Sequence, residues 1–151
     1  MLPKIHAIFG IIFSILFYII FHITLFAAFL IFLASVLIDS DHYIWYVYTK
    51  KSLNITKAYI WFKEKRKKWF KLSQKERDKY KRAYLIFHSI EFWVILFLLS
   101  YFNKIFLYML IGILFHMILD FIEIFYIREK YYFKLSLVWI YLKNHNKENF
   151  Y

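Results

Sequence analysis

The chain separates long apolar runs from one strongly polar segment, and this separation predicts where its helices lie. No Asp, Glu, Lys or Arg occurs from residue 5 to residue 38. At about 1.5 Å per helical residue, that run is roughly 50 Å long, enough for two crossings of a bilayer core of about 30 Å. We therefore expect a helical hairpin, with helices over about Lys4–Phe21 and 25–38 and a tight turn at 22–24.

A second hairpin is predicted further along the chain. Residues 73–76 read Ser-Gln-Lys-Glu, which has the form of a capping box, and we expect a helix to run from there without a break through the apolar stretch 84–102. A turn at 103–104 then leads into a fourth helix over about 105–127. The shorter amphipathic stretch 131–142 is expected to lie along the membrane interface.

Composition supports an all-α fold, because the chain has only two glycines and one proline to interrupt helices. The sequence thus predicts an integral membrane four-helix bundle made of two antiparallel hairpins. Its transmembrane domain spans 1–127, and residues 128–151 form an interfacial or cytoplasmic tail. Cysteine is absent, which excludes disulfides and thiolate metal sites.

The positive charge is concentrated between the two hairpins. Segment 43–82 holds fourteen of the 21 Lys and Arg residues and three carboxylates, so its formal charge equals the +11 of the whole chain. Lys104 is the one basic residue at the opposite turns, and the positive-inside rule therefore places segment 43–82 in the cytoplasm as a basic helical insert. We expect a multi-pass protein of the inner cell membrane with both termini cytoplasmic.

Ionisable side chains gather near the cytoplasmic ends of all four predicted membrane helices. Because consecutive helices alternate in direction, these ends fall in one layer, which a bundle of two hairpins can close into one pocket. The side chains of this layer are His6, Asp39, Asp41, His42, His88, Glu91, His116, Asp120 and Glu123. In the last helix, His116, Asp120 and Glu123 are spaced by four and three residues and so share one helical face.

Each of these residues also has a simpler explanation as a marker of the headgroup layer, where charge costs well below the ~2.5–3.5 kcal/mol of the bilayer centre. For His6 or Glu91 taken singly, that explanation weighs as much as function. It is weaker for 39–42, where three ionisable groups in four residues repel or compete unless something neutralises them. Imidazole and carboxylate suit zinc, manganese or iron, and without thiolates a catalytic metal site is favoured over a structural one.

The order of these residues resembles a known family. The motifs are His6-x-x-x-Gly10, Asp39-x-Asp41-His42, His88-Ser89 and Gly112-x-x-x-His116-x-x-x-Asp120. They resemble the LexA-binding, inner-membrane-associated hydrolases, also described as membrane-bound metal-dependent hydrolases, over roughly residues 1–125. The resemblance implies a small helical membrane protein with a metal site, whose ligands would be His6, Asp39, Asp41, His42, His88, His116 and Asp120. Family members often have a His-Arg pair shortly before the His-Ser; residues 82–87 hold no histidine, and Glu91 or Arg82 would take its place.

The sequence therefore favours a metal-dependent hydrolase of a phosphoester, such as a lipid head group, with zinc or manganese bound. Glu91 and Glu123 are candidates for the general base or for orienting the ligands. The alternative is a non-enzymatic membrane adaptor whose basic face binds anionic lipid, protein or DNA, although a membrane surface explains that face more economically than nucleic acid. A metal or proton transporter is less favoured, because the far halves of the helices hold no ionisable residue except His22 and Lys104.

Overall fold

The computed structural model describes residues 3–126, 128, 135–145 and 147–150, and over these residues it is all-helical, with no strand. The helices begin and end close to the predicted positions in the first hairpin and in the last membrane helix. Their bounds are α1 Pro3–Phe21, α2 Leu25–Leu37, α3 Ser40–Lys50, α4 Ile55–Lys71, α5 Gln74–Arg77, α6 Ile90–Ser100, α7 Lys104–Tyr126 and α9 Leu137–Asn144.

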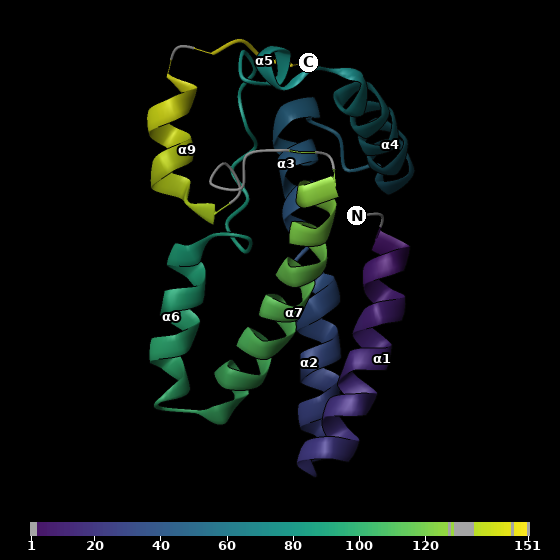
Figure 1. Ribbon diagram of the computed structural model, residues 1–151, viewed down its shortest axis with the longest axis vertical. Coiled ribbons are helices and arrows are strands. Elements are labelled where there is room, and N and C mark those ends of the chain that lie inside the picture. Colours follow the sequence, from purple (N-terminus) through teal and green to yellow (C-terminus); the bar gives the residue numbers. More distant parts are fainter. Residues whose placement is uncertain (1–2, 127, 129–134, 146, 151) are drawn as a thin grey trace.

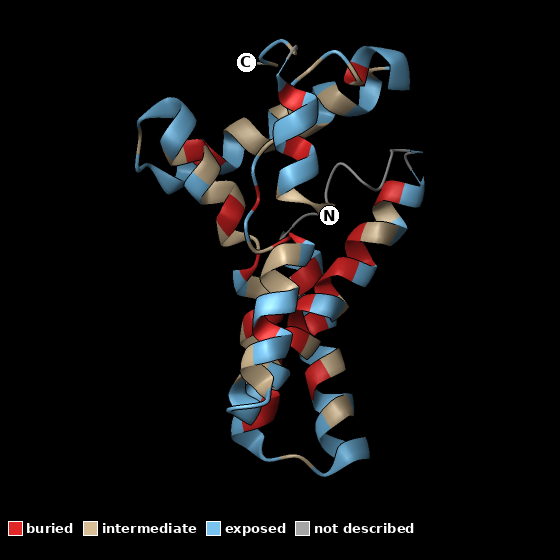
Figure 2. Ribbon diagram, turned by 90° about the vertical axis from the view of Figure 1, so that its left-hand side faces the viewer, coloured by how far each residue is buried: buried red, intermediate tan, exposed pale blue. Residues whose placement is uncertain are grey.

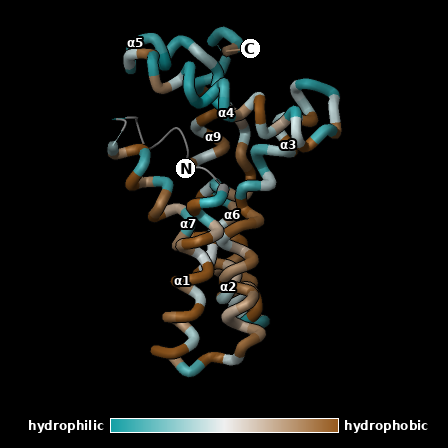
Figure 3. The backbone as a smooth tube through the Cα atoms, turned by 90° about the vertical axis from the view of Figure 1, so that its right-hand side faces the viewer, coloured by the Kyte–Doolittle hydropathy of each residue, from teal (hydrophilic) through white to brown (hydrophobic). Residues whose placement is uncertain are grey.

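Three helices are long and apolar enough to cross a membrane. They are Lys4–Phe21, Lys104–Tyr126 and the continuous stretch Leu25–Lys50, in which α3 directly prolongs α2. Figure 1 shows α1, α2 and α7 side by side, with α6 along the other flank of α7. The hydrophobic colouring follows these helices, whereas the hydrophilic residues collect at the end that carries α4 and α5 (Figure 3). The expected class of helical membrane protein is therefore supported by length and composition.

The expectation of one continuous helix from residue 73 to residue 102 is wrong. Ser73 and Glu76 do form the predicted capping box, but α5 ends at Arg77 and α6 begins only at Ile90. At about 1.5 Å per residue, the 11 residues of α6 extend roughly 16 Å, about half of a bilayer core. A four-helix transmembrane bundle is therefore not confirmed.

The backbone between α5 and α6 makes its hydrogen bonds outside any helix. The Lys81 N–H donates to the Glu148 carbonyl at 2.8 Å, and the Glu148 N–H donates to the Lys79 carbonyl at 3.0 Å. The Asn144 side chain bonds both the N–H and the carbonyl of Arg82 at 2.9 Å. Because buried backbone groups must be paired, these distant partners hold the segment extended where local pattern alone favoured helix.

Close packing of α7 on α2 depends on a glycine. A methyl group placed on Gly112 would overlap the backbone carbonyl of Ile31 and touch Ala34. Small residues allow such backbone approach between membrane helices. Figure 2 shows the buried residues gathered in the middle of the molecule, where these helices meet. This contact brings the ionisable residues of α7 against the end of α2.

Candidate metal centre

Four separate segments deliver histidine and aspartate side chains to one place. α1 contributes one histidine, the junction of α2 and α3 an aspartate and a histidine, the residue two before α6 a histidine, and α7 a histidine and an aspartate. We call these residues the His/Asp cluster: His6, Asp39, His42, His88, His116 and Asp120. Their ligand atoms form three overlapping groups, each with all atoms within 4.8 Å of one another. The structure thus brings together six of the seven ligands predicted from the sequence, and the seventh, Asp41, contacts them.

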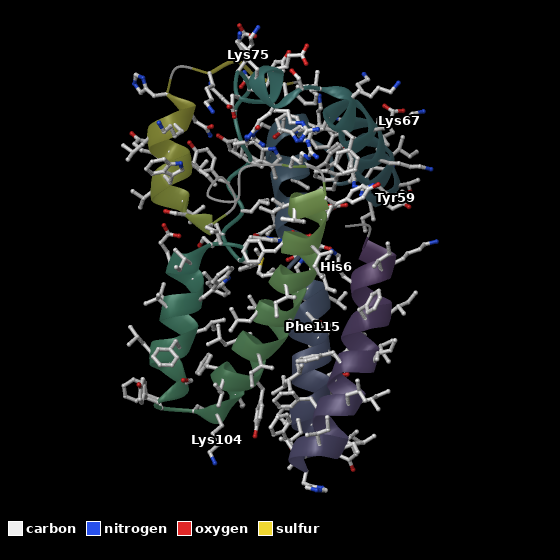
Figure 4. All side chains as sticks on the ribbon, in the orientation of Figure 1. His6, Tyr59, Lys67, Lys75, Lys104 and Phe115 are labelled. Atoms are coloured by element: carbon white, nitrogen blue, oxygen red, sulfur yellow. The ribbon has the colours of Figure 1, made fainter. Side chains whose placement is uncertain are left out.

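Local structure explains how each member reaches the cluster. His6 lies near the start of α1, on the side that faces α7 (Figure 4), and its ring stacks on that of His116 with centroids 3.8 Å apart. Asp39 lies where α2 passes into α3, so that it and His42 are one turn apart. Ser89 caps α6 by accepting from the Phe92 N–H at 3.3 Å, which fixes His88 just outside that helix.

One carboxylate oxygen lies at the centre of the cluster. Asp39 Oδ1 is 3.7 Å from Nε2 of His42, 3.7 Å from Nε2 of His116 and 3.9 Å from Nε2 of His88. These separations exceed hydrogen-bonding distance. They are close to the ~3.4 Å that separates two ligand atoms each about 2.1 Å from a tetrahedral zinc ion. The spacing therefore suits atoms that share an ion better than atoms that share a proton.

Hydrogen bonds on the outer sides of two rings set their tautomers. His116 Nδ1 is 2.7 Å from the Ser35 carbonyl, which can only accept, so Nδ1 carries the hydrogen. His88 Nδ1 is 3.1 Å from Asp41 Oδ2 and donates in the same way. In the neutral rings, both Nε2 atoms then present lone pairs toward Asp39 Oδ1. Two lone pairs and a carboxylate oxygen repel one another, and a cation between them would remove that repulsion.

His6 supplies the test of whether a metal fits. Both of its ring nitrogens, and Nε2 of His116, are buried and make no hydrogen bond among the described residues. His6 Nε2 lies 3.4 Å from Asp120 Oδ1, again longer than an ordinary hydrogen bond. A buried polar atom without a partner costs about 1–3 kcal/mol. Coordination would satisfy Nε2 of His116 and one ring nitrogen of His6, and imidazole with carboxylate is a donor set that zinc and manganese accept.

Asp41, predicted as a ligand, orients a ligand in the structure. Its Oδ2 accepts from the Phe87 N–H at 2.6 Å, the His88 N–H at 3.3 Å and His88 Nδ1. The side chain is almost fully buried. Three donors on this oxygen fix the position of the loop before α6 and the direction of the His88 ring, which is how carboxylates around metal sites commonly act.

The structure places the two candidate base residues outside the cluster. Glu91 accepts from the Ser136 hydroxyl at 2.7 Å and the Leu137 N–H at 3.2 Å, at the start of α9. Glu123 pairs with Arg66 of α4. Arg82, the other candidate for the missing family histidine, lies against the Trp69 ring and near Asp78. None of the three belongs to the close groups of ligand atoms among the described residues.

The members of the cluster differ in exposure. The side chains of His6, His88, His116 and Asp120 are at most 3% exposed, whereas those of Asp39 and His42 are 17% and 34% exposed. The His42 ring meets the edge of Phe62 in α4, with centroids 5.5 Å apart. The two more exposed members of the cluster are therefore Asp39 and His42, and His42 lies next to α4.

Sequence reasoning missed the groups that orient the cluster. The Ser35 carbonyl and the Phe87 N–H are backbone atoms, which carry no signal in the sequence. The spacing of Ser35 and Asp39 puts both on one helical face, but it does not indicate that the Ser35 carbonyl bonds His116.

Comparisons with known proteins were made for the whole chain. No protein-family model matches it, and neither the curated proteins nor the solved structures give a significant match. Its function is therefore inferred from the geometry and chemistry of the His/Asp cluster.

Proposed function

We propose that this protein is a membrane-bound metal-dependent hydrolase that acts on a phosphoester, in a lipid head group or a similar substrate, at the cytoplasmic face of the membrane. One observation carries the proposal: imidazoles from four segments surround the buried Asp120 and the partly exposed Asp39 at distances suited to a shared ion. Such a cluster is costly in an apolar bundle unless it serves a purpose. The motif resemblance points the same way.

The residues divide into ligands and residues that orient them. His6, Asp39, His42, His88, His116 and Asp120 would hold the ion, while Asp41 and the Ser35 carbonyl fix two of the rings. A divalent zinc or manganese ion, when bound, supplies Lewis acidity and lowers the pKa of water toward ~7. Asp39 and His42 form the exposed side, where a substrate can approach and a proton can be exchanged with solvent.

The substrate class follows from charge and location. A cluster at the membrane end that carries the Lys/Arg-rich helix α4 lies in a field that attracts anions. Phosphoesters are anionic, and those of lipids are already present at this depth. Metal ions are also well suited to polarising the phosphoryl oxygen of such a substrate.

The membrane arrangement is part of the proposal. We propose four crossings, with α6 and its flanking residues as the short fourth one and both termini on the cytoplasmic side with α4. The partition of basic residues supports this orientation, since Lys104 is the only one of 21 at the turns between α1 and α2 and between α6 and α7. Reporter fusions at residues 60 and 151 should both report cytoplasm; opposite reports would contradict it.

Hydrolysis is tested with purified protein in detergent. Wild type is given phospholipids and generic phosphodiesters with added Zn²⁺ or Mn²⁺, and metal-stimulated release of product is expected. Asp120→Asn should abolish it, because a ligand charge is lost at almost unchanged volume. His22→Asn, which alters a histidine at the far turn in a backbone conformation that asparagine tolerates, is the matched control and should keep full activity.

The adaptor alternative predicts the opposite pattern. There the Asp120 variant would lose stability without any activity to lose, and deleting the charges of Lys63, Lys67 and Lys68 would be the damaging change. The adaptor would replace the hydrolase proposal if the wild type showed no metal-stimulated turnover and its binding of anionic partners depended on those lysines.

A further inference from the structure

Two lysines from different helices converge on one tryptophan, away from the His/Asp cluster. Lys65 Nζ lies 4.6 Å from the centre of the Trp61 ring, and Lys50 Nζ lies 5.6 Å from the same ring. Trp61 is held in place by the buried Tyr46 of α3, with ring centroids 5.6 Å apart. The three residues Lys50, Trp61 and Lys65, which we call the Lys-Trp site, therefore join α3 to α4.

The two ammonium groups lie near the same tryptophan ring. Among the described residues, no carboxylate forms an ion pair with Lys50 or Lys65. Burial, together with the nearby charge of Lys50, lowers the pKa of Lys65 to about 8. At neutral pH Lys65 stays mostly protonated, so the half-buried Lys65 and the exposed Lys50 are two like charges on one tryptophan. An anion that both ammonium groups reach would convert their repulsion into attraction.

The position of the Lys-Trp site indicates where the anion comes from. Lys50 is the last residue of the apolar stretch Leu25–Lys50, so its side chain lies at the end of a helix suited to crossing the membrane. Exposed apolar and aromatic residues such as Ile55, Tyr59 and Ile60 flank Trp61 on α4. Tryptophan, tyrosine and lysine in this combination are typical of the headgroup layer.

We infer that Lys50, Lys65 and Trp61 form a binding site for the phosphate group of an anionic membrane lipid. Phosphate offers several acceptor oxygens to two ammonium groups, and the adjacent apolar residues would lie against the glycerol and the first part of the acyl chains. This inference goes beyond the hydrolase proposal, because it requires neither a bound metal nor turnover. It also gives α4 a second anchor beside the Arg66 pair with Glu123.

Aromatic contacts connect the Lys-Trp site to His42 of the His/Asp cluster. Trp61 meets Phe62 with ring centroids 4.7 Å apart, and Phe62 meets His42. A lipid held at this site would therefore place its head group on the side where Asp39 and His42 are exposed. Binding of the lipid can be measured whether or not the cluster then hydrolyses it.

The experiment uses the full chain in neutral detergent and native mass spectrometry to count bound lipid. The probe is dihexanoyl phosphatidylglycerol, a phosphodiester with one negative charge. Lys50→Gln with Lys65→Gln should lower its affinity about 30-fold, since each of the two cations near a lipid phosphate contributes roughly one kcal/mol. Lys65→Arg should keep most of the affinity. The matched control, Lys63→Gln with Lys67→Gln, removes the same charge from exposed positions of α4 and should change affinity less than about twofold.

Three results would overturn the inference. Equal losses in the test and control pairs would mean that the whole basic surface, rather than this site, attracts lipid. Equal binding of dihexanoyl phosphatidylcholine would show that the Lys-Trp site does not distinguish a lipid with negative net charge from one without it. Competition by inorganic phosphate at the same concentration would assign the Lys-Trp site to a soluble phosphate. Circular dichroism of each variant separates loss of the site from loss of the fold.

Discussion

The two halves of the membrane helices differ in what they bury. Toward the turns that carry His22 and Lys104, α1 and α7 meet through aromatic rings, and Phe13 stacks on Phe115 at 3.9 Å between centroids. Toward α4, the same two helices meet through His6 and His116, also stacked at 3.8 Å. The stack of Phe13 on Phe115 involves apolar rings only, so it needs no hydrogen-bond partner. The second contact leaves imidazole nitrogens buried and unsatisfied, so stacking geometry alone does not explain it.

On α7, one half of the helix therefore contributes to packing, and the other half carries residues of the His/Asp cluster. Phe115 and His116 are neighbours in sequence, and both contact α1 or α2, yet only His116 is tied to a backbone carbonyl and turned toward a carboxylate. An apolar half needs no ligand to be stable in lipid, whereas the polar half gains its stability when its charges are balanced. Substitutions in the two halves should therefore have different consequences.

The largest effect is expected for His116→Ala. Loss of one ligand removes both charge balance and geometry, and we expect bound metal to fall to background while the protein still inserts. Phe115→Ala should do the reverse, lowering the melting temperature through lost packing while keeping the metal. Elemental analysis and thermal melting of both variants provide the measurement. Equal metal content in the two variants would show that the two halves of the helix do not differ in metal binding.

A smaller effect is expected for Asp41→Asn. The amide keeps the size of the side chain but weakens its hold on His88 Nδ1, and the loss of an orienting carboxylate typically lowers metal affinity about 10- to 100-fold. Competition with a chelator of known affinity measures this change. An affinity as low as that of the His116 variant would instead make Asp41 a direct ligand, as its place in the sequence motif first indicated.

The two glycines should respond unequally to alanine. Gly112→Ala would overlap the Ile31 carbonyl, which cannot move independently of α2, and should destabilise the protein by about 1–3 kcal/mol. Gly10→Ala meets the Ser35 hydroxyl, which can rotate away, and should cost less. Melting in the same detergent compares them. A larger loss for Gly10 would contradict the close packing of α7 on α2.

The smallest effect concerns pH and the Lys-Trp site. Lys65 and Lys50 both lie near the Trp61 ring, and the charged form of Lys65 is the one that attracts an anion. With its pKa at about 8, the charge is present at pH 7 and mostly lost at pH 9. Phosphatidylglycerol affinity should therefore fall roughly fivefold over this range. Lys65→Arg stays charged and should show a flat profile; a parallel fall in that variant would assign the effect to another group.

Much of the fold could be predicted because lipid-facing helices have a simple code. The uncharged run to residue 38 predicted α1 and α2, and the run near residue 115 predicted α7. Each predicted end lies within one or two residues of the observed end. The failure lay between Ser73 and Ser100, where the capping box formed but the helix stopped after four residues. Its backbone is bonded to Asn144 and Glu148, more than sixty residues away, and to Asp41, and local pattern carries no information on such partners.

The cluster was predictable for a similar reason. Alternating helix direction places residues from the ends of α1, α2 and α7 in one layer whatever the details of packing, so His6, Asp39 and His116 could be grouped from their positions alone. The roles of Glu91 and Glu123 could not be predicted from their positions alone. Each lies at the correct depth, but α9 and α4 supply it with other partners, and the docking of those helices is set by tertiary contacts.

The central claim is that the His/Asp cluster holds a divalent ion. X-ray absorption of the protein purified after growth with zinc and manganese tests it most directly. We predict about one ion or more per chain, a first shell of nitrogen and oxygen at about 2.0–2.2 Å, and outer-shell scattering from imidazole. A protein that carries no ion, or one whose ion lacks imidazole scattering, would contradict the account.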